Sequence, residues 1–307
     1  MQCHKKCLLN FFTILFYLIG GDRSLSANER ILSTHIVGGL GNQLFMVAAA
    51  IAVSSDYGYQ LTLPKITKAD SFFEPRPVYW DTVFHKFPTH PPNLNLNLIT
   101  HEDPSCLYYT KIIPVHDRII LAGYFPSAKY FDHHRDKILE LFQLPDALQA
   151  VVEQKYQEII HAENEDTVSI HVRLDDTFKF HPINGVIDFW REPYNSYYDQ
   201  AIALFPGDVT FVVFSDNCSW TREFMKEKLK GRRAVYVCNQ DYIDLFLMAR
   251  CKHNILVNST YSWWGSYLNR NPDKIVVSPK YWQKRENTPC RADVLMSNWV
   301  LIDNIYD

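Results

Sequence analysis

Short polar side chains and two adjacent indoles follow an apolar, strand-like run in the last quarter of the chain. The motif is Asn258-Ser259-Thr260-Tyr261-Ser262-Trp263-Trp264-Gly265, preceded by residues 253–257. The first-turn N–H groups of a helix lack intrahelical partners, and the helix dipole favours negative charge there. If a helix begins here, the hydroxyls and the amide could bind an anion or a sugar. The structural alternative is that Ser259 or Thr260 caps the helix and the indoles anchor the core.

A glycine-rich turn predicts a second place where backbone can approach a ligand. Gly38-Gly39-Leu40-Gly41-Asn42-Gln43 follows one apolar run and opens a helical pattern. It is not a dinucleotide fingerprint, because Leu44 replaces the third glycine, and no lysine stands where a phosphate loop needs one. A structural turn explains the glycines equally well. The amides of Asn42 and Gln43 add donors and acceptors that suit sugar hydroxyls.

His171-Val172-Arg173 ends another apolar run, and the two-residue period of a strand sends His171 and Arg173 to the same side. The planar guanidinium of Arg173 could clamp a diphosphate. The alternative is a surface ion pair with Asp175 or Asp176. We interpret His171 as a buried, hydrogen-bonded histidine rather than a base.

Two further acids follow or open predicted elements. Asp216 ends the strand-like run 209–215 and could accept a hydrogen bond from a ribose or a base edge, although Asp is also a common turn former. Asp244 could face the ligand or stabilise a helix start. The triplets that begin at Asn217 and Asn258 match the glycosylation pattern, but we interpret both as structural or ligand-binding because they follow predicted strands.

The elements that would position these residues alternate along the chain. Strands are predicted at 31–37, 59–63, 117–123, 168–173, 209–215, 234–238, 254–259 and 274–278, and helices at 43–56, 146–161, 193–204, 220–230, 242–251 and 261–268. Such alternation is typical of parallel sheets with helices on both faces. We predict an α/β fold of two units, 29–145 and 146–307, with the ligand in the cleft between them. The irregular region 71–97 would supply acceptor-binding loops.

Composition narrows the classes of partner. The 307 residues are 47% hydrophobic, and a formal net charge of −3 gives no electrostatic footprint for nucleic acid. Seven cysteines include no C-x-x-C pair, which argues against a cysteine zinc site and does not demand a disulfide framework.

Residues 1–28 predict targeting. His4-Lys5-Lys6 precede the apolar stretch 7–19, which is short for a membrane span but suits a signal sequence. A signal anchor, a signal peptide cleaved near Ser24-Leu25-Ser26, and an upstream start codon chosen in error are the alternatives. We expect attachment through residues 7–19 as a single-pass type II membrane protein of the Golgi or secretory pathway, with a secreted or cytoplasmic protein as the alternative.

The motifs together resemble the alpha-1,2-fucosyltransferases of glycosyltransferase family 11, in unbroken order from about residue 31 to residue 282. The matching positions are 38–45, 123–125, 129–131, 171–173, 214–216, 244–245, Met248, 251–253, 258–264, Pro279 and Trp282. The resemblance implies two Rossmann-like units in a GT-B-type arrangement with the active site in the cleft. It also implies an inverting transfer of L-fucose from GDP-fucose to a galactose hydroxyl of a glycan acceptor, in alpha-1,2 linkage. Neither a metal nor another cofactor is implied, and the chain has no Asp-x-Asp motif.

The resemblance also implies roles for individual residues. Arg173, Asn42 and Asp176 form the expected catalytic set, with Arg173 on the pyrophosphate and Asp176 as the candidate general base. The expected donor-binding residues are Gly39, Gly41, His171, Asp216, Asn258, Ser259, Thr260 and Ser262.

One loop departs from the family pattern. The family has His-x-Arg-Arg-Gly-Asp, whereas this chain has His171-Val172-Arg173-Leu174-Asp175-Asp176. Losing one cation and gaining an anion predicts weaker donor binding, by about 1–3 kcal/mol for a charge-assisted hydrogen bond. Another cation compensates, the donor differs, or activity is low. The alternative function is therefore a catalytically weak or inactive module that binds glycan or nucleotide. A nicotinamide oxidoreductase would lack its glycine fingerprint here.

Overall fold

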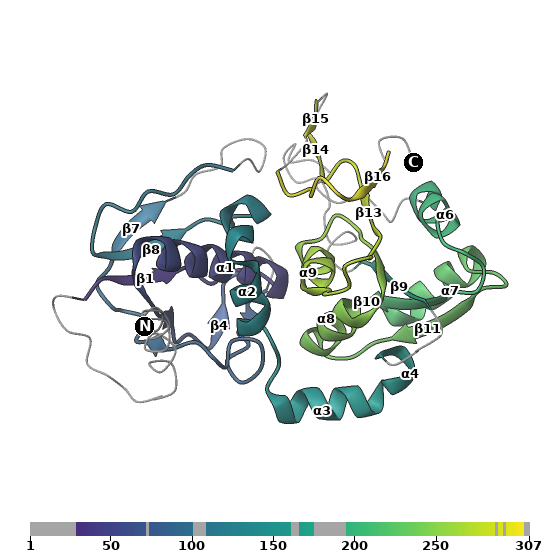
Figure 1. Cartoon of the computed structure of the whole chain (residues 1–307), viewed down its shortest axis with the longest axis horizontal. Coiled ribbons are helices and arrows are strands. Elements are labelled where there is room, and N and C mark those ends of the chain that lie inside the picture. Colours follow the sequence, from purple (N-terminus) through teal and green to yellow (C-terminus); the bar gives the residue numbers. More distant parts are fainter. Residues whose placement is uncertain are drawn as a thin grey trace, which may run out of the picture.

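The chain builds two parallel β-sheets with helices packed against them (Figure 1). The computed structural model describes residues 29–71, 74–100, 109–160, 166–174, 195–285, 288–290 and 293–303. Every strand pair within the two larger sheets is parallel. The expected α/β class is therefore confirmed.

The first sheet has the strand order β2-β1-β8-β7. Its strands are β1 (Ile31–Thr34), β2 (Gln60–Leu61), β7 (Asn97–Thr100) and β8 (Arg118–Ala122). Helix α1 (Leu40–Tyr57) follows β1 and is buried along most of its length, because it is apolar on nearly every side. It ends where Gly58 adopts the left-handed region at φ 67°, a conformation that favours glycine.

The second sheet has the strand order β11-β10-β9-β12-β13-β16. Its strands are β9 (Thr167–Val172), β10 (Thr210–Ser215), β11 (Arg233–Val237), β12 (His253–Ile255), β13 (Val276–Pro279) and β16 (Val300–Ile302). Numbered within this sheet, the order is 3-2-1-4-5-6, the order of the dinucleotide-binding fold. The chain reverses direction across the sheet between β9 and β12, and ligands of such folds bind beyond the carboxyl ends of strands at that point.

Helices cover both faces of the second sheet. On one face, α6 (Asn195–Ala203) and α7 (Cys218–Lys228) bury Tyr197, Tyr198 and Met225 against Val168 and Ile170. On the other face, α8 (Asp241–Arg250) packs with α3 (Asp146–Lys155) and α4 (Gln157–Ile160). Burial on both faces explains the nearly continuous apolar runs of β9 and β10.

Helix α9 (Thr260–Leu268) follows β12 but belongs to the core of the first sheet. The ring of Trp263 lies 4.5 Å from that of Phe45 on α1, and Trp264 stacks on Phe131 at 5.4 Å and 17°. Both indoles are fully buried. The helix therefore joins the two halves of the chain through aromatic packing.

Short elements complete the fold. They are β3 (Leu63–Pro64) paired with β6 (Thr89–His90), β4 (Lys68–Ala69) with β5 (Arg76–Pro77), β14 (Gln283–Arg285) with β15 (Thr288–Cys290), the 3-10 turns η1 (Ala128–Tyr130) and η2 (Asp132–His134), and α2 (Arg135–Leu141). Between residues 71 and 97, the described strands β5 and β6 have two residues each. The expected irregularity of this region is confirmed.

Two expected helices differ in their bounds, and some strands were not expected. The helix expected at 146–161 is divided into α3 and α4, with Tyr156 as the C-cap of α3. Helix α1 begins at Leu40 rather than at Gln43, because the backbone N–H groups of Asn42 and Gln43 already donate to the carbonyl of Gly39. Strands β7 and β16 of the two larger sheets were not expected.

The expected type II membrane location is corrected. Across the residues that the structure describes, none of the helices combines the length and the apolarity needed to cross a bilayer. The stretch 7–19, on which the expectation of a signal anchor rested, lies outside the described residues.

Candidate active site

The candidate site lies beyond the carboxyl ends of β9 and β12, where the second sheet reverses its strand order. Arg173 comes directly after β9, and Ser259 is the N-cap of α9 after β12. Since these strands are parallel neighbours, their ends bring the two residues together.

Arg173 contacts the N-terminus of α9. Its Nη1 donates to Oγ of Ser259 at 3.1 Å, and the same oxygen accepts from the backbone N–H of Tyr261 at 3.3 Å. A guanidinium and the positive end of a helix dipole thus lie side by side. Two positive groups in this arrangement favour an anion between or above them.

The N-terminal turns of α1 and α9 are in direct contact. Thr260 Oγ1 donates to Asn42 Oδ1 at 2.8 Å. A Cβ on Gly41 would lie 2.5 Å from both the carbonyl carbon of Thr260 and the backbone nitrogen of Tyr261. Gly41 is therefore required by the close approach of the helices, and Asn42 is held next to Thr260 rather than across an open cleft.

Asp216 supports the loop that carries Arg173. Its Oδ1 accepts from the backbone N–H of Leu174 at 2.8 Å. The Leu174 side chain is fully buried in the apolar core of the second sheet. The residue that stands where the family pattern has a second Arg is therefore part of the core.

His171 is a neutral wall residue of the site. Burial, aided by the charge of Arg173, lowers its pKa to about 3. Its ring lies 5.2 Å from that of Tyr261, and its buried Nδ1 has no partner among the described residues. A group with so low a pKa is a poor general base near neutral pH.

Other members of the expected donor set are bonded within the fold. Asn258 is buried and its Nδ2 donates to the carbonyl of Trp282 at 3.3 Å. The Ser262 hydroxyl, also buried, donates to the carbonyls of Val257 and Ser259, at 3.2 Å each. Ser259 caps the helix and both indoles are buried in the core, as the structural alternative expected. Because Asn258 is buried, it is also unsuited to carry a glycan.

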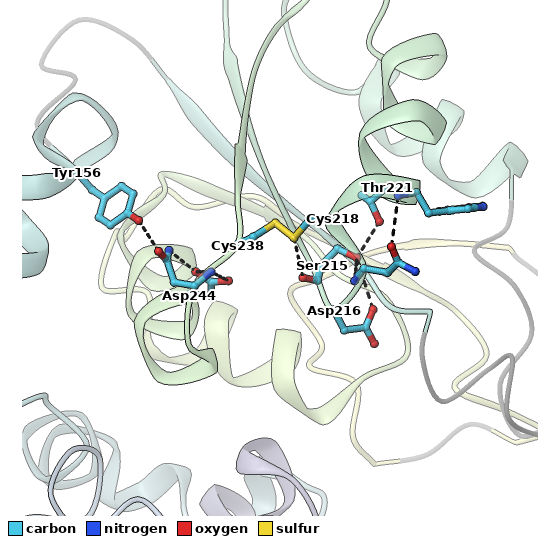
Figure 2. Close-up of a disulfide and its surroundings, with 10 residues drawn as sticks. Tyr156, Ser215, Asp216, Cys218, Thr221, Cys238 and Asp244 are labelled. Atoms are coloured by element: carbon cyan, nitrogen blue, oxygen red, sulfur yellow. Dashed lines mark hydrogen bonds between the residues drawn. A yellow bond between two sulfur atoms is a disulfide. The ribbon is translucent and has the colours of Figure 1, made fainter.

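A disulfide borders the site on the side of β10 and β11. It joins Cys218, at the start of α7, to Cys238, just after β11 (Figure 2). Next to it, Thr221 Oγ1 donates to Ser215 Oγ at 2.7 Å, and Asn217 caps α7 by accepting from the backbone N–H of Trp220. The composition did not demand this disulfide.

Asp244 lies in the first turn of α8, which follows β11. It accepts hydrogen bonds from the backbone N–H and the side-chain amide of Asn239, and Asn239 in turn accepts from the hydroxyl of Tyr156 (Figure 2). Burial raises the pKa of Asp244. The carboxylate is thus engaged in a polar network rather than only stabilising the start of α8.

Asp241 and Tyr79 are site neighbours that the sequence reasoning missed. The Tyr79 hydroxyl donates to the Asp241 carboxylate, whose pKa is raised by burial. The backbone carbonyl of Asp241 accepts from the hydroxyl of Tyr261 at 2.6 Å. An acid in the first turn of a helix was the available signal for Asp241, but nothing marks Tyr79, 162 residues away in sequence.

Three further residues considered in the sequence analysis are Asp175, Asp176 and Gly39. Asp175 and Asp176, the latter the expected general base, lie outside the described residues. Gly39 is the N-cap of α1 and has open space at its Cβ position.

A pocket of about 240 Å³ lies away from the candidate site, between α2 and the face of α8 that carries Phe246. None of the candidate residues lines it.

Sequence comparison places the chain among the glycosyltransferase enzymes. Residues 108–303 match the model of glycosyl transferase family 11, and the chain belongs to that family.

Bacterial and primate proteins are similar in sequence to this chain. The O-antigen biosynthesis glycosyltransferase WbnK of Escherichia coli is 36% identical over an alignment of 196 residues that covers 59% of this chain and 59% of that protein. An alpha-1,2-colitosyltransferase of Escherichia coli is 25% identical over 89% of this chain and 99% of its own length. Galactoside alpha-(1,2)-fucosyltransferase 1 of Leontopithecus chrysomelas is 26% identical over 48% of this chain and 42% of that protein. The chain thus spans less than two thirds of the first and third of these relatives.

Solved structures of fucosyltransferases share the fold. NodZ from Bradyrhizobium has a TM-score of 0.51 at 15% identity, over 78% of this chain and 93% of that chain. POFUT1 in complex with GDP has a TM-score of 0.50 at 14% identity, over 83% and 99%. At this identity the likeness concerns the fold alone, which is of the GT-B-like α/β class.

Proposed function

We propose that this protein is an inverting fucosyltransferase that moves L-fucose from GDP-fucose to a galactose hydroxyl of a glycan, in alpha-1,2 linkage. The observation that carries the proposal is the contact of Arg173 with the N-cap of α9 at the point where the strand order reverses. A nucleoside diphosphate suits this place, because the guanidinium and the helix N-terminus can both stabilise its negative charge. The named activities of the colitosyl- and fucosyltransferase relatives support the linkage.

The mechanism is a single displacement. The acceptor oxygen attacks the anomeric carbon from the face opposite the diphosphate, and the bond to the diphosphate oxygen breaks with its electron pair. Arg173 and the N-terminal end of α9 stabilise the charge that develops on the leaving group. Asn42, bonded to Thr260, holds the two helix starts in register. We keep Asp176 as the base that takes the acceptor proton, and we propose that no metal is required.

The arrangement of the halves is part of the same proposal. Residues 29–145 would form the acceptor-side unit and 146–307 the donor-side unit of a GT-B arrangement, with the substrates in a cleft between them. Support comes from the strand order of the second sheet and from the meeting of α1 and α9. The galactose-terminated acceptor would then contact loops between residues 71 and 97.

Colitose is a second candidate for the transferred sugar. The relative aligned over 99% of its own length is named an alpha-1,2-colitosyltransferase. A catalytically weak module that binds glycan or nucleotide is the other candidate, because Leu174 is buried in the core and supplies no second cation.

Calorimetry and a transfer assay test the proposal together. We expect GDP to bind and UDP, GTP and NAD to bind much more weakly, and we expect labelled GDP-fucose to yield a fucosylated galactoside. Absence of GDP binding would refute the proposal. Binding without transfer would favour the module, and transfer from GDP-colitose in preference to GDP-fucose would assign the second sugar.

A further inference from the structure

A cluster of two imidazoles and a carboxylate lies away from the candidate active site. Asp56 belongs to the last turn of α1, and His133 and His134 belong to η2. His133 Nε2 lies 3.0 Å from Asp56 Oδ2, and His134 Nε2 lies 2.7 Å from Asp56 Oδ1. All three side chains are partly exposed, so an ion could reach them from solvent.

We propose that Asp56, His133 and His134 bind a divalent first-row transition metal of the Zn²⁺ type. One ligand atom from each residue lies within 4.8 Å of the other two. Around tetrahedral zinc, ligands at 2.0–2.1 Å are about 3.3 Å from one another. Measured to one oxygen, Asp56 Oδ1, the nitrogen–oxygen distances are 3.2 Å for His133 and 2.7 Å for His134, so they would need to open by no more than about 0.6 Å.

The choice of metal follows from the donor set. Neutral imidazole nitrogens suit Zn²⁺, Co²⁺ and Ni²⁺, whereas Mg²⁺ and Ca²⁺ prefer oxygen ligands. Three protein ligands leave at least one position for water.

The surrounding charges are mixed. The negative end of the α1 dipole lies at Asp56 and favours a cation, and the last turn of α1 has no basic residue. Lys137 opposes it from α2, but its Nζ donates to Ser55 Oγ at 2.9 Å. The carboxylate and the helix end thus favour a cation here, and the Lys137 ammonium is hydrogen-bonded to Ser55.

A metal here would act on stability rather than on the chemical step. Asp56 follows Asn42 by 14 residues of the same helix, which corresponds to about 21 Å. The η2 turn follows Phe131 directly, and the ring of Phe131 packs on Trp264 and on Phe45. The ion would therefore fix the end of α1 to the segment that carries the aromatic contacts with α9.

The test is zinc binding by the full chain with any affinity tag removed. Titration with ZnCl₂ in a calorimeter should give a site that Asp56→Asn, His133→Ala and His134→Ala each weaken by at least about tenfold. His85→Ala is the matched control, because His85 is exposed and bonded only to its neighbouring turn in the described structure. Mg²⁺ should not compete, and Zn²⁺ should raise the melting temperature of wild type and the control alone.

Other results would overturn the proposal. Zinc affinity that is unchanged in all three variants would place the ion elsewhere, for example on thiols. A lack of saturable binding would leave the cluster as an exposed ion pair. The GDP affinity of the three variants should match that of wild type, so failure here is distinguishable from failure of the proposed transferase activity.

Discussion

At the scale of single residues, Arg173 is the side chain on which the proposed chemistry depends. We expect Arg173→Ala to lower kcat/KM for fucosyl transfer by about 100- to 1000-fold, because one donor to the developing charge is lost. The kcat/KM of Arg173→Lys should lie between those of wild type and Arg173→Ala, because lysine keeps the charge but not the planar guanidinium. Steady-state kinetics with GDP-fucose measures both variants.

The control for Arg173 is Arg250→Ala. Arg250 is a half-exposed arginine whose Nη2 lies 3.0 Å from Oε1 of Glu153, away from the strand ends of the site. Its loss should leave kcat/KM nearly unchanged, and circular dichroism should show native folds for all three proteins. Near-normal turnover of Arg173→Ala would remove Arg173 from the mechanism.

Residue types predicted the neighbourhood of the site better than the direction of each side chain. Arg173 and Ser259 lie together because parallel strands must deliver their carboxyl ends to one edge of the sheet. The sequence alone cannot distinguish a hydroxyl that faces a ligand from one that, like that of Ser262, is bonded to its own helix turn. The same holds for Leu174, whose burial depends on tertiary packing.

At the scale of elements, the crossing of α1 and α9 is the contact most open to test. Gly41→Ala would place a methyl group against the backbone of Thr260 and Tyr261, which cannot rotate away. We expect a loss of about 1–3 kcal/mol in the free energy of unfolding and a loss of transfer activity, because the helix starts must separate. Urea unfolding and the transfer assay measure the two effects.

Gly39→Ala is the matched control, two residues earlier. No atom lies within 4 Å of its Cβ position, and its φ of −74° is open to alanine. Its cost should stay below about 1 kcal/mol. Equal destabilisation of the two variants would show that the close approach of the helices is not what requires Gly41.

Element types were predictable because hydrophobic periodicity reports burial locally. The core that each element joins was not. Helix α9 follows a strand of the second sheet, yet Trp263 and Trp264 pack on Phe45 of the first half, a partner more than 200 residues earlier. A run of buried aromatic residues predicts that the segment packs in a core, but it does not identify the element against which it packs.

At the scale of the whole molecule, stability should depend on pH through histidines that are buried in neutral form. The folded pKa of His171 is about 3, whereas an unfolded histidine has a pKa of about 6.5. Between these values the unfolded chain binds more protons than the folded chain, so stability falls as pH falls. Burial lowers the pKa of His90 and His253 in the same direction.

We therefore expect the free energy of unfolding to decrease by about 1.4 kcal/mol from pH 7.5 to pH 5.5 on account of His171 alone. In His171→Gln this part of the decrease should disappear, even if the variant is less stable at both pH values, while His90 and His253 keep their share. His85→Gln, a change at an exposed histidine, should retain the wild-type slope. Urea unfolding at the two pH values measures all three proteins. Equal slopes in wild type and His171→Gln would mean that the pKa of His171 in the folded protein lies close to its unfolded value, and a charged imidazole beside Arg173 would then have to be counted with the anion site at acidic pH.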